Sequence, residues 1–506
     1  MSTRTPIVDR VARVAPWLVA AYWRARIHAA SFQRLYEAAQ PSNYHRRPPA
    51  AGSADHSVDR AGPRLWDWAR HLDENSDLAV GILDYLCTRI VGPGLVVTPA
   101  VLARDGKPHQ VVNTQIEAIC RRHDRAIDVS GQLTRGTLEA LLCRSWLRDG
   151  DVFMQHVQGR ATGYPFATGA LPYVVEPLEA EMVPLDYHDA TARTRFGIQF
   201  DTWGRPLIYH VALEHPGDTG TAMLRTRTKR VRAEAMTHLA FRRRLRQSRG
   251  VSILAAVIHR LDDIKEIEDT ERVAARVAAA LTAVLEKSPE YAQLYGQAEI
   301  AQGAARDFQV APGMVLDRLL PGEKIGIIKS DRPNPHLPEF RRSQIEMVAA
   351  GTMTAASSIS RRYDGSYASQ RQELVESRGP IDTLRALFAD TVTREIHRRR
   401  IDMAIASGML QVPADVDLDT LDDCEIAGPG QDWIDPAREA NGAATSLENN
   451  VDSPQSIMRR RGLDPRRIRR EILEWREVMG QPVPAGATPR PEPADPDATD
   501  TETEAA

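Results

Sequence analysis

The sequence predicts an α+β fold in which helices at both ends of the chain enclose a region of short strands. Apolar residues recur at helical spacing between residues 65 and 148. Between residues 152 and 241 the spacing changes to the alternation that is typical of strands. Helical spacing returns from residue 252, and a second short stretch of strand-forming residues interrupts it after residue 288.

Composition limits the classes of protein that the chain can represent. Its 506 residues suffice for roughly three domains or for one large discontinuous domain. Lys and Arg number 65 against 68 Asp and Glu, and the formal charge of -3 excludes a protein that coats DNA through its overall charge. The four cysteines form no CxxC pair and no zinc-type Cys/His cluster, so we expect a reduced, intracellular chain with no metal and no cofactor. No run approaches the ~18 apolar residues of a membrane helix, so we expect no membrane partner.

The first 63 residues are expected to stand apart from the folded body. Residues 1–40 form a predicted N-terminal helical segment, and the apolar stretch at 14–23 suits an amphipathic helix that docks on the body or on a neighbouring subunit. Arginines precede this stretch as they do in a signal peptide, but no small-residue cleavage site follows it. Residues 41–63 are rich in Pro, Gly, Ser and charge, which predicts a linker.

Local signals divide the next part of the chain into helices and strands. Helical spacing predicts two helices within 65–90, separated near Glu74 and Asn75, and two more at 112–123 and 132–148. Gly204 supplies the turn of a predicted hairpin over 196–211. Short β-branched or aromatic runs predict the strands, at 152–157, 171–176, 195–201, 206–213 and 236–241.

A long helix is predicted where helical spacing returns. Residues 252–287 keep helical steps without Gly or Pro, which gives a rod on the order of 50 Å. The following insertion, 288–336, contains two predicted strands, 314–316 and 324–328, and ends in a group of prolines.

Helices dominate the predicted remainder of the chain. A helix at 340–353 precedes a polar loop at 357–366, and the next helix, 370–407, is interrupted at Gly379-Pro380. Helical pieces over 445–479 lead to residues 481–506, whose Pro, Ala, Thr and acidic residues predict a disordered acidic tail.

Three stretches depart strongly from the average charge of the chain. Residues 225–249 hold ten Lys/Arg and one acid, 415–425 hold six acids and no base, and 459–470 hold seven arginines and one aspartate. The first stretch fits either a phosphate-facing patch or a subunit interface that faces an acidic neighbour, for which 415–425 is a candidate, and we favour the interface. Aromatic residues are not interleaved with these arginines, which argues against base stacking on single strands.

The motifs of common enzymes are missing from the sequence. It has no GxxxxGK[ST], HExxH, GxSxG or GxGxxG in a suitable context. Asp149 and Asp151 have side chains that suit a hard cation, but Asp-Gly-Asp after a helix is more typical of a turn. His156, His210 and His238 lie in strand-like runs, where a hydrogen-bonded structural histidine is commoner than a ligand. We therefore expect no catalytic residue.

Eight short segments resemble, in their order along the chain, those of one protein family. They are 82–86 with 91–95, 146–153 (WLRDGDVF), 171–176, 196–211, His238 with 247–252, 312–314 with 320–323, 366–371 and 433–439. In this order they resemble the portal proteins of tailed bacteriophages, in the lambda-like branch, over about residues 60–475. Ala368 departs from the family, which more often has a second Ser at that position.

This resemblance implies a portal fold whose parts follow the order of the chain. In the DNA channel, the tunnel loop would bring Ser357, Ser358, Ser360, Arg361 and Arg362 nearest to DNA. The implied parts are a mixed α/β wing (64–251), a stem helix (252–287), a small α/β clip (288–336), a second stem helix (337–356), the tunnel loop (357–366) and wing and crown helices (367–480).

The resemblance also implies a function and partners. About twelve copies would form a closed ring at one capsid vertex, through which double-stranded DNA is packaged and ejected. A terminase large subunit docking on the clip, the major capsid or scaffolding protein and a head-tail adaptor would be its partners. The chain would assemble in the host cytoplasm and act in the virion. Each subunit of such a ring needs two different complementary faces, which the acidic and arginine-rich stretches can supply.

Two other functions remain open at the level of sequence. One is a metal-dependent DNA-processing enzyme that uses Asp149 and Asp151. The other is a cytoplasmic scaffolding or adaptor protein, which would form monomers or irregular complexes instead of rings.

Overall fold

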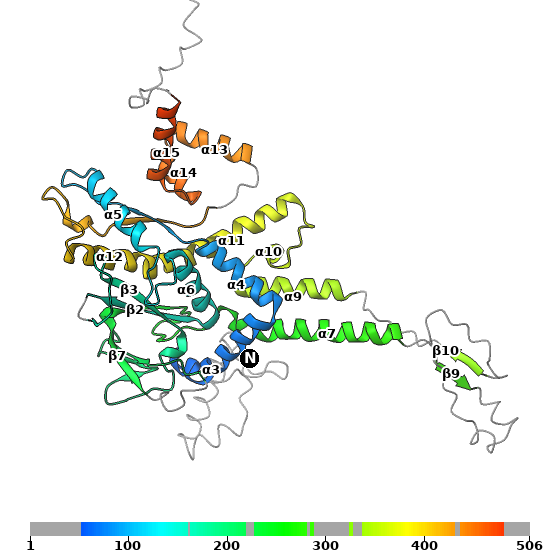
Figure 1. The fold of residues 1–506 in the computed structure, drawn as a ribbon. Coiled ribbons are helices and arrows are strands. Elements are labelled where there is room, and N and C mark those ends of the chain that lie inside the picture. Colours follow the sequence, from blue (N-terminus) through cyan, green and yellow to red (C-terminus); the bar gives the residue numbers. More distant parts are fainter. Residues whose placement is uncertain are drawn as a thin grey trace, which may run out of the picture. The chain divides into compact units, whose positions relative to one another are not determined.

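The computed structural model describes residues 52–159, 162–218, 227–280, 284–287, 323–326, 336–430 and 436–479 (Figure 1). Two helices, α3 (Ala54–Asn75) and α4 (Asp77–Ile90), open this part of the chain. Their separation after Asn75 confirms the predicted boundary. The predicted linker over 41–63 is wrong from Ala54 onward, because Val58 and Trp66 lie on one buried face of a continuous helix. Residues 1–51 lie outside the described residues, and so does the predicted N-terminal helical segment.

The main core forms where α4 packs against α5 (Gln110–His123) and α6 (Arg135–Asp149). Trp146 of α6 is fully buried, and its ring lies 6.2 Å from the rings of both Phe241 and Phe388. Aromatic side chains from three distant parts of the sequence therefore meet in one core.

Two antiparallel sheets follow α6. In the first, β2 (Asp151–Gln158) lies between β3 (Tyr173–Leu178) and β8 (Met236–Ala240), and Phe153 is opposite both Leu178 and His238. The second sheet runs in the order β4-β5-β6-β7. Its strands are Thr194–Arg195, Ile198–Phe200, Pro206–Ala212 and Thr228–Arg232.

The hairpin predicted over 196–211 is confirmed. Strands β5 and β6 pair, and Gly204 in their turn has a φ of 88°, a conformation that favours glycine. A third pairing was not predicted: β1 (Val96–Pro99) pairs with β11 (Cys424–Ala427). This pairing ties the two halves of the sequence together.

The long predicted helix is shorter in the structure than expected. A 3-10 turn at Ile253–Ala256 precedes α7, which spans Ile258–Ala280 and is roughly 35 Å long. Residues Val284–Lys287 form strand β9, which pairs with β10 (Glu323–Gly326). A segment of four residues is too short for its spacing to separate helix from strand, so the prediction ran on into β9. The predicted strand at 314–316 lies outside the described residues.

The returning helices are α9 (Leu337–Thr352), the short α10 (Ala356–Ser360), α11 (Tyr367–Phe388) and α12 (Arg394–Ala406). The predicted interruption at Gly379-Pro380 is wrong, since α11 continues through Pro380. Ile381, Leu384 and Phe388 are buried beyond the proline and hold the helix against the core. The irregularity comes later, in a π-helical turn at Ala389–Thr393.

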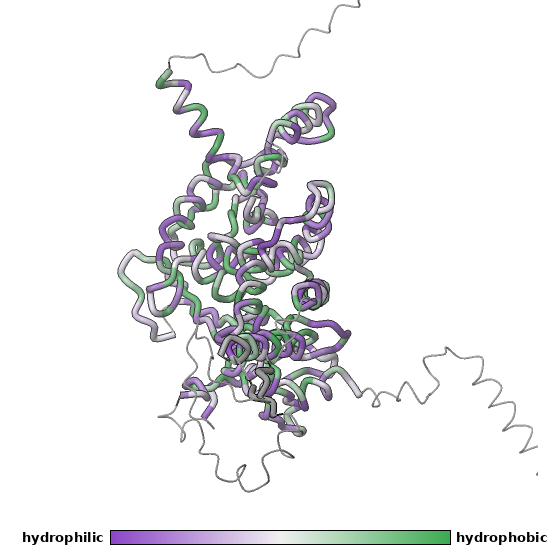
Figure 2. The backbone as a smooth tube through the Cα atoms, turned by 90° about the vertical axis from the view of Figure 1, so that its right-hand side faces the viewer, coloured by the Kyte–Doolittle hydropathy of each residue, from purple (hydrophilic) through white to green (hydrophobic). Residues whose placement is uncertain are grey.

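Three further helices confirm the predicted helical character of the C-terminal part. They are α13 (Pro436–Glu448), α14 (Pro454–Arg460) and α15 (Pro465–Val478), and the predicted tail at 481–506 lies outside the described residues. Hydrophilic and hydrophobic residues alternate along the helices, as amphipathic packing requires (Figure 2). No helix in the described part of the chain has the length and apolar character needed to cross a membrane.

Candidate functional site

Two backbone segments pack closely where α6 passes into β2 and meets the turn that leads to α7. Gly150 has a φ of 88°, and a Cβ placed there would lie 2.3 Å from the carbonyl carbon of Val251. A Cβ on Gly250 would lie 1.9 Å from the carbonyl oxygen of Gly150. The two backbones can approach this closely only because both positions lack a side chain. We call this contact, 149–151 against 249–251, the α6–β2 joint.

Arg249 fills the centre of the α6–β2 joint and is fully buried. Its Nε donates to Asp151 Oδ2 at 2.6 Å. The terminal nitrogens donate to three backbone carbonyls, those of Ala180 (2.8 Å), Val183 (2.9 Å) and Phe196 (3.1 Å). This one side chain therefore links β2, the segment after β3 and the turn between β4 and β5.

Asp151 balances the charge of Arg249. Its Oδ1 accepts a hydrogen bond from the Gly250 amide at 2.6 Å and lies 3.1 Å from His238 Nε2. Burial by itself would raise the pKa of Asp151, but Arg249 and His238 outweigh it and hold that pKa well below its usual range. The same burial lowers the pKa of His238, although Asp151 opposes this change.

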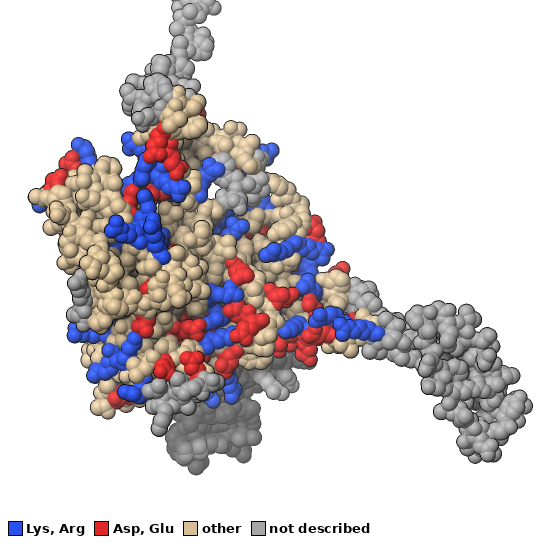
Figure 3. All heavy atoms as spheres, in the orientation of Figure 1, with Lys and Arg blue, Asp and Glu red and all other residues tan. Residues whose placement is uncertain are grey.

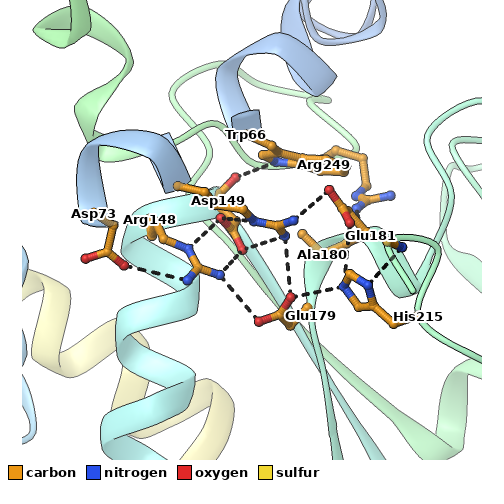
Figure 4. A network of polar contacts seen from close by, with 11 residues as sticks. Trp66, Asp73, Arg148, Asp149, Glu179, Ala180, Glu181, His215 and Arg249 are labelled. Carbon is orange, nitrogen blue, oxygen red and sulfur yellow. Dashed lines mark hydrogen bonds and ion pairs between the residues drawn. The ribbon is translucent and has the colours of Figure 1, made fainter. Parts of the chain in front are cut away.

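A second ionic network surrounds Asp149 (Figure 4). The Asp149 carboxylate accepts two hydrogen bonds from Arg148, at 2.9 and 2.8 Å, and two from Arg70, at 3.4 and 3.2 Å. Its backbone carbonyl accepts a hydrogen bond from Trp66 Nε1 at 2.8 Å. Arg148 also lies 3.6 Å from Asp73, which connects α6 to α3.

These contacts assign a structural role to the Asp-Gly-Asp motif. All carboxylate oxygens of Asp149 and Asp151 face arginine, histidine or amide donors, so they are committed to structural contacts. Across the described ranges, no group of three or more His, Cys, Asp or Glu side chains has the arrangement of a metal site. The motif is thus a turn, which the sequence favoured over a cation site.

The three strand histidines have structural surroundings, as predicted. His156 is buried, with Nδ1 2.9 Å from the Tyr173 hydroxyl and Nε2 2.8 Å from Thr237 Oγ1. Burial lowers the pKa of His156 to about 3. His238 faces Asp151, and the ring of His210 lies 4.6 Å from that of Tyr187.

The predicted tunnel-loop residues do not form one loop. Ser357, Ser358 and Ser360 lie in helix α10, where the Ser357 amide donates to Glu373 Oε1 at 3.1 Å and Ser360 Oγ to the Ala356 carbonyl at 2.8 Å. The predicted loop over 357–366 is therefore wrong in its first half. Ile359 explains the helix, because its buried side chain anchors this turn to the core.

The exposed loop is confined to residues 361–366. Arg361 ends α10 with a left-handed φ of 52°, and Arg362 Nε lies 2.6 Å from Asp364 Oδ2. Both arginines are exposed. A hollow of about 590 Å³ lies beside them between α9 and α11. Of the five predicted residues, the two arginines are the ones that present freely accessible side chains.

Helices α7 and α9 come between the joint and this loop in the order of the chain. The two helices lie side by side in Figure 1, and Arg260 Nη1 of α7 donates to Gln344 Oε1 of α9 at 2.7 Å. Arg341 of α9 also forms an ion pair with Glu268. Acidic and basic side chains intermingle over the face that carries α3, α7 and α9 (Figure 3), so this face is not a continuous basic surface.

Two expectations about charge need correction. Arg249 belongs to the basic stretch 225–249, yet it is fully buried and cannot face DNA or a neighbour. The acidic stretch 415–425 and the arginine-rich stretch 459–470 are not wholly free for other subunits, since Glu425 pairs with Arg459. Arg466 likewise pairs with Glu117 of α5 at 3.3 Å.

Sequence reasoning missed the pairing of Arg249 with Asp151. The two residues are 98 positions apart, so no local pattern joins them. The signal that could have pointed to this pair was the family resemblance, because both residues lie in segments that resemble the family, 146–153 and 247–252.

Residues 41–385 match the family model described as phage portal protein, lambda family. Because this match covers more than half of the 506 residues, the chain belongs to the lambda family of phage portal proteins. It is a portal protein, as the resemblance predicted.

Individual relatives are distant. A protein named "Probable portal protein", from Halomonas phage phiHAP-1, is 24% identical over 435 residues, which cover 84% of this chain and 82% of the relative. A chain from the virion of a native gene transfer agent particle is 12% identical with a TM-score of 0.41, over 86% of this chain and 96% of the other. A chain from the neck of the native particle is 13% identical with a TM-score of 0.40, also over 86% and 96%.

Proposed function

We propose that this chain forms the ring, of about twelve copies, through which double-stranded DNA enters and leaves a phage capsid. The observation that carries the proposal is the family match over residues 41–385. The ring would stand at one vertex of the virion after assembly in the host cytoplasm. The chain would act as a passive conduit without catalytic residues.

The paired helices α7 and α9 support a conduit. Helix α7 begins just after the α6–β2 joint, and α9 lies beside it and returns to the turn at Ile253–Ala256 before α10 and the exposed loop 361–366. This order suits a pair of stem helices followed by a tunnel loop. Arg361 and Arg362 are the residues that we propose to lie nearest to DNA. Their small number, on a chain with a formal charge of -3, suits brief phosphate contacts that do not hold a sliding duplex.

Further partners follow from the same proposal. The segment between α7 and α9 would receive the terminase large subunit, which supplies the ATPase, and later the head-tail adaptor. The outer part of the ring would contact the major capsid or scaffolding protein. These assignments rest on family membership.

Electron micrographs of the purified full chain test the proposal. We expect annular particles with a central hole. Monomers or irregular aggregates at every salt concentration would contradict a ring and favour a scaffolding or adaptor protein.

The rival enzyme has a separate test. Cleavage of DNA by the purified chain that depends on Mg²⁺ or Mn²⁺ and is lost in Asp149→Asn would support it. We expect no cleavage, because arginines and amides already occupy both carboxylates of the Asp-Gly-Asp motif.

A further inference from the structure

A large basic hollow lies beside the second sheet, and no residue that the structure describes fills it. Its volume is about 1270 Å³, and its lining includes Arg193 and Arg195 from the β4 region and Arg242 and Arg246 from the turn after β8. We call it the arginine hollow. Asp201 is the one acid among the described lining residues. The hollow therefore carries an excess of positive charge.

Three of the four arginines of the hollow form no ion pair with an acid in the described part of the chain. Arg193, Arg242 and Arg246 are exposed, and no ion pair joins them to any described acid. Asp201 holds its own turn, because its Oδ1 accepts hydrogen bonds from the amides of Trp203 (2.8 Å) and Arg205 (2.7 Å). An anionic group from outside would thus find unpaired guanidinium groups.

Two large exposed apolar side chains belong to this region: Trp203 lines the hollow, and Leu245 directly precedes the lining residue Arg246 in the sequence. Trp203 is 93% exposed at the tip of the β5–β6 hairpin, and Leu245 is 97% exposed between Arg242 and Arg246. Such exposure is costly in water unless a partner covers the side chain. Trp and Arg are also the residues most often found at the energetic centre of protein interfaces.

The turns that carry these side chains are held in shape before any partner arrives. Gln247 Oε1 accepts hydrogen bonds from the amides of Arg243 and Arg244, at 3.1 and 3.2 Å, and Gln247 Nε2 donates to the Arg249 carbonyl at 2.7 Å. Gln247 is buried, so it fixes the turn after β8 to the α6–β2 joint. A prearranged surface loses little conformational entropy on binding.

A complementary surface exists elsewhere on the same chain. Between α12 and β11, Asp419, Asp422 and Asp423 form no ion pair with any residue that the structure describes, and Leu418 beside them is 64% exposed. We call Leu418 with these three aspartates the acidic ridge. Its backbone is fixed to the β1 region, since the Asp423 carbonyl accepts a hydrogen bond from the Ala100 amide at 2.9 Å.

We propose that the acidic ridge of one copy docks in the arginine hollow of the next copy. Both surfaces combine unpaired charge with an exposed apolar side chain, and their charges are opposite. They lie on different elements, as a head-to-tail ring contact requires of its two faces. The inference rests on the proposed ring and names the contact that closes it.

Charge reversal tests this contact in the full chain. Arg242→Glu/Arg246→Glu and Asp419→Arg/Asp423→Arg should each lower the fraction of chains in rings by about tenfold at low salt, since like charges then meet. The quadruple variant should restore rings, because a reversed hollow meets a reversed ridge. Arg60→Glu/Arg64→Glu, an equal change of charge on the exposed side of α3, is the matched control and should assemble as the unaltered chain does.

The outcomes separate this inference from the proposed function. Two results would overturn the proposed contact and leave the proposed ring intact. In one, the unaltered chain and both double variants all form rings; in the other, the quadruple variant forms no more rings than the double variants do. If the unaltered chain forms no rings, the proposed function itself fails. Rings that persist in Arg242→Glu/Arg246→Glu but lose binding of a DNA duplex would assign the hollow to nucleic acid and overturn the inference.

A crosslink keeps the test decisive if a reversed variant fails to fold. A photoreactive phenylalanine analogue in place of Leu245 should crosslink assembled rings, and mass spectrometry should find the bond in the peptide of a second copy that holds Leu418. Crosslinks confined to other segments would overturn the inference.

Discussion

Arg249 and Asp151 form an ion pair of 2.6 Å in which both side chains are fully excluded from solvent. The pair joins β2 to the turn that leads into α7, and the remaining nitrogens of Arg249 bind three carbonyls around it. Strand β2 and the turn that leads into α7 are thus held together by one buried ion pair.

Removal of the arginine should destabilise the chain strongly. In Arg249→Met the Asp151 carboxylate stays buried without its partner, so we expect the free energy of unfolding to fall by ~3–5 kcal/mol. Urea denaturation of the unassembled chain measures this. Arg205→Met, an exposed control, should change stability by less than ~1 kcal/mol. An equal, small effect of both substitutions would contradict the role given to the pair.

The close approach of Gly150 to the chain at Val251 gives a second prediction. Gly150 and Gly159 both have positive φ, 88° and 72°, but a Cβ on Gly159 meets nothing within 4 Å. Gly159→Ala should therefore cost only backbone strain, about 1 kcal/mol. Gly150→Ala adds a collision with Val251 and should cost roughly 3 kcal/mol more, as shown by thermal or urea unfolding. If Gly150→Ala and Gly159→Ala lower the free energy of unfolding equally, the backbones at the joint do not approach each other as closely as described.

Acid should destabilise the protein through its buried histidines. Burial lowers the pKa of His156 to about 3, whereas the unfolded chain has the ordinary value near 6.5. The unfolded state therefore binds more protons as the pH falls below 6.5, and stability is lost progressively toward pH 3. His156 alone should account for a loss of about 2 kcal/mol between pH 7 and pH 5.

Substitution isolates this contribution. The free energy of unfolding of His156→Gln should fall by about 2 kcal/mol less between pH 7 and pH 5 than that of the unaltered chain. This difference does not depend on how stable the variant is at pH 7. His259→Gln, on the exposed side of α7, should keep the slope of the unaltered chain. A slope that is unchanged in His156→Gln would mean that this histidine is protonated in the folded state.

The exposed arginines of the loop 361–366 provide a test of the channel. Particles assembled with Arg361→Ala/Arg362→Ala should differ from unaltered ones in the yield of filled heads or in the salt dependence of DNA retention, because two phosphate-binding groups are lost. Arg121→Ala/Arg122→Ala, which removes two adjacent exposed arginines from α5, is the matched control. Packaging and retention that are unaltered in the loop variant would exclude these side chains from the channel lining.

The features that the sequence predicted best are those set by residues that lie close together in the chain. The hairpin at Gly204 and the boundary near Asn75 are set by a turn residue and by local spacing, and both are found in the structure. The part of helix α3 before Leu65 was missed because polar residues and Pro63 obscured the buried face that includes Val58 and Trp66. Composition over a short window does not reveal a face that is completed one or two turns later.

Contacts across long stretches of sequence were not predictable from spacing. The pairing of β1 with β11 and that of Asp151 with Arg249 depend on how the chain folds back on itself. The basic stretch 225–249 shows the consequence: its charge was apparent, but only the structure separates buried Arg249 from exposed Arg242 and Arg246. The five predicted loop residues show the same limit. The three serines lie in helix α10 because the buried side chain of Ile359 anchors that helix, whereas the two arginines follow the helix and are exposed.

The mass of the assembled protein tests the central claim most directly. Mass photometry of the purified full chain should find a discrete particle about twelve times the 56.2 kDa mass of one chain. A single species of one chain mass under all solution conditions, or a continuous spread of masses without a closed form, would contradict the account.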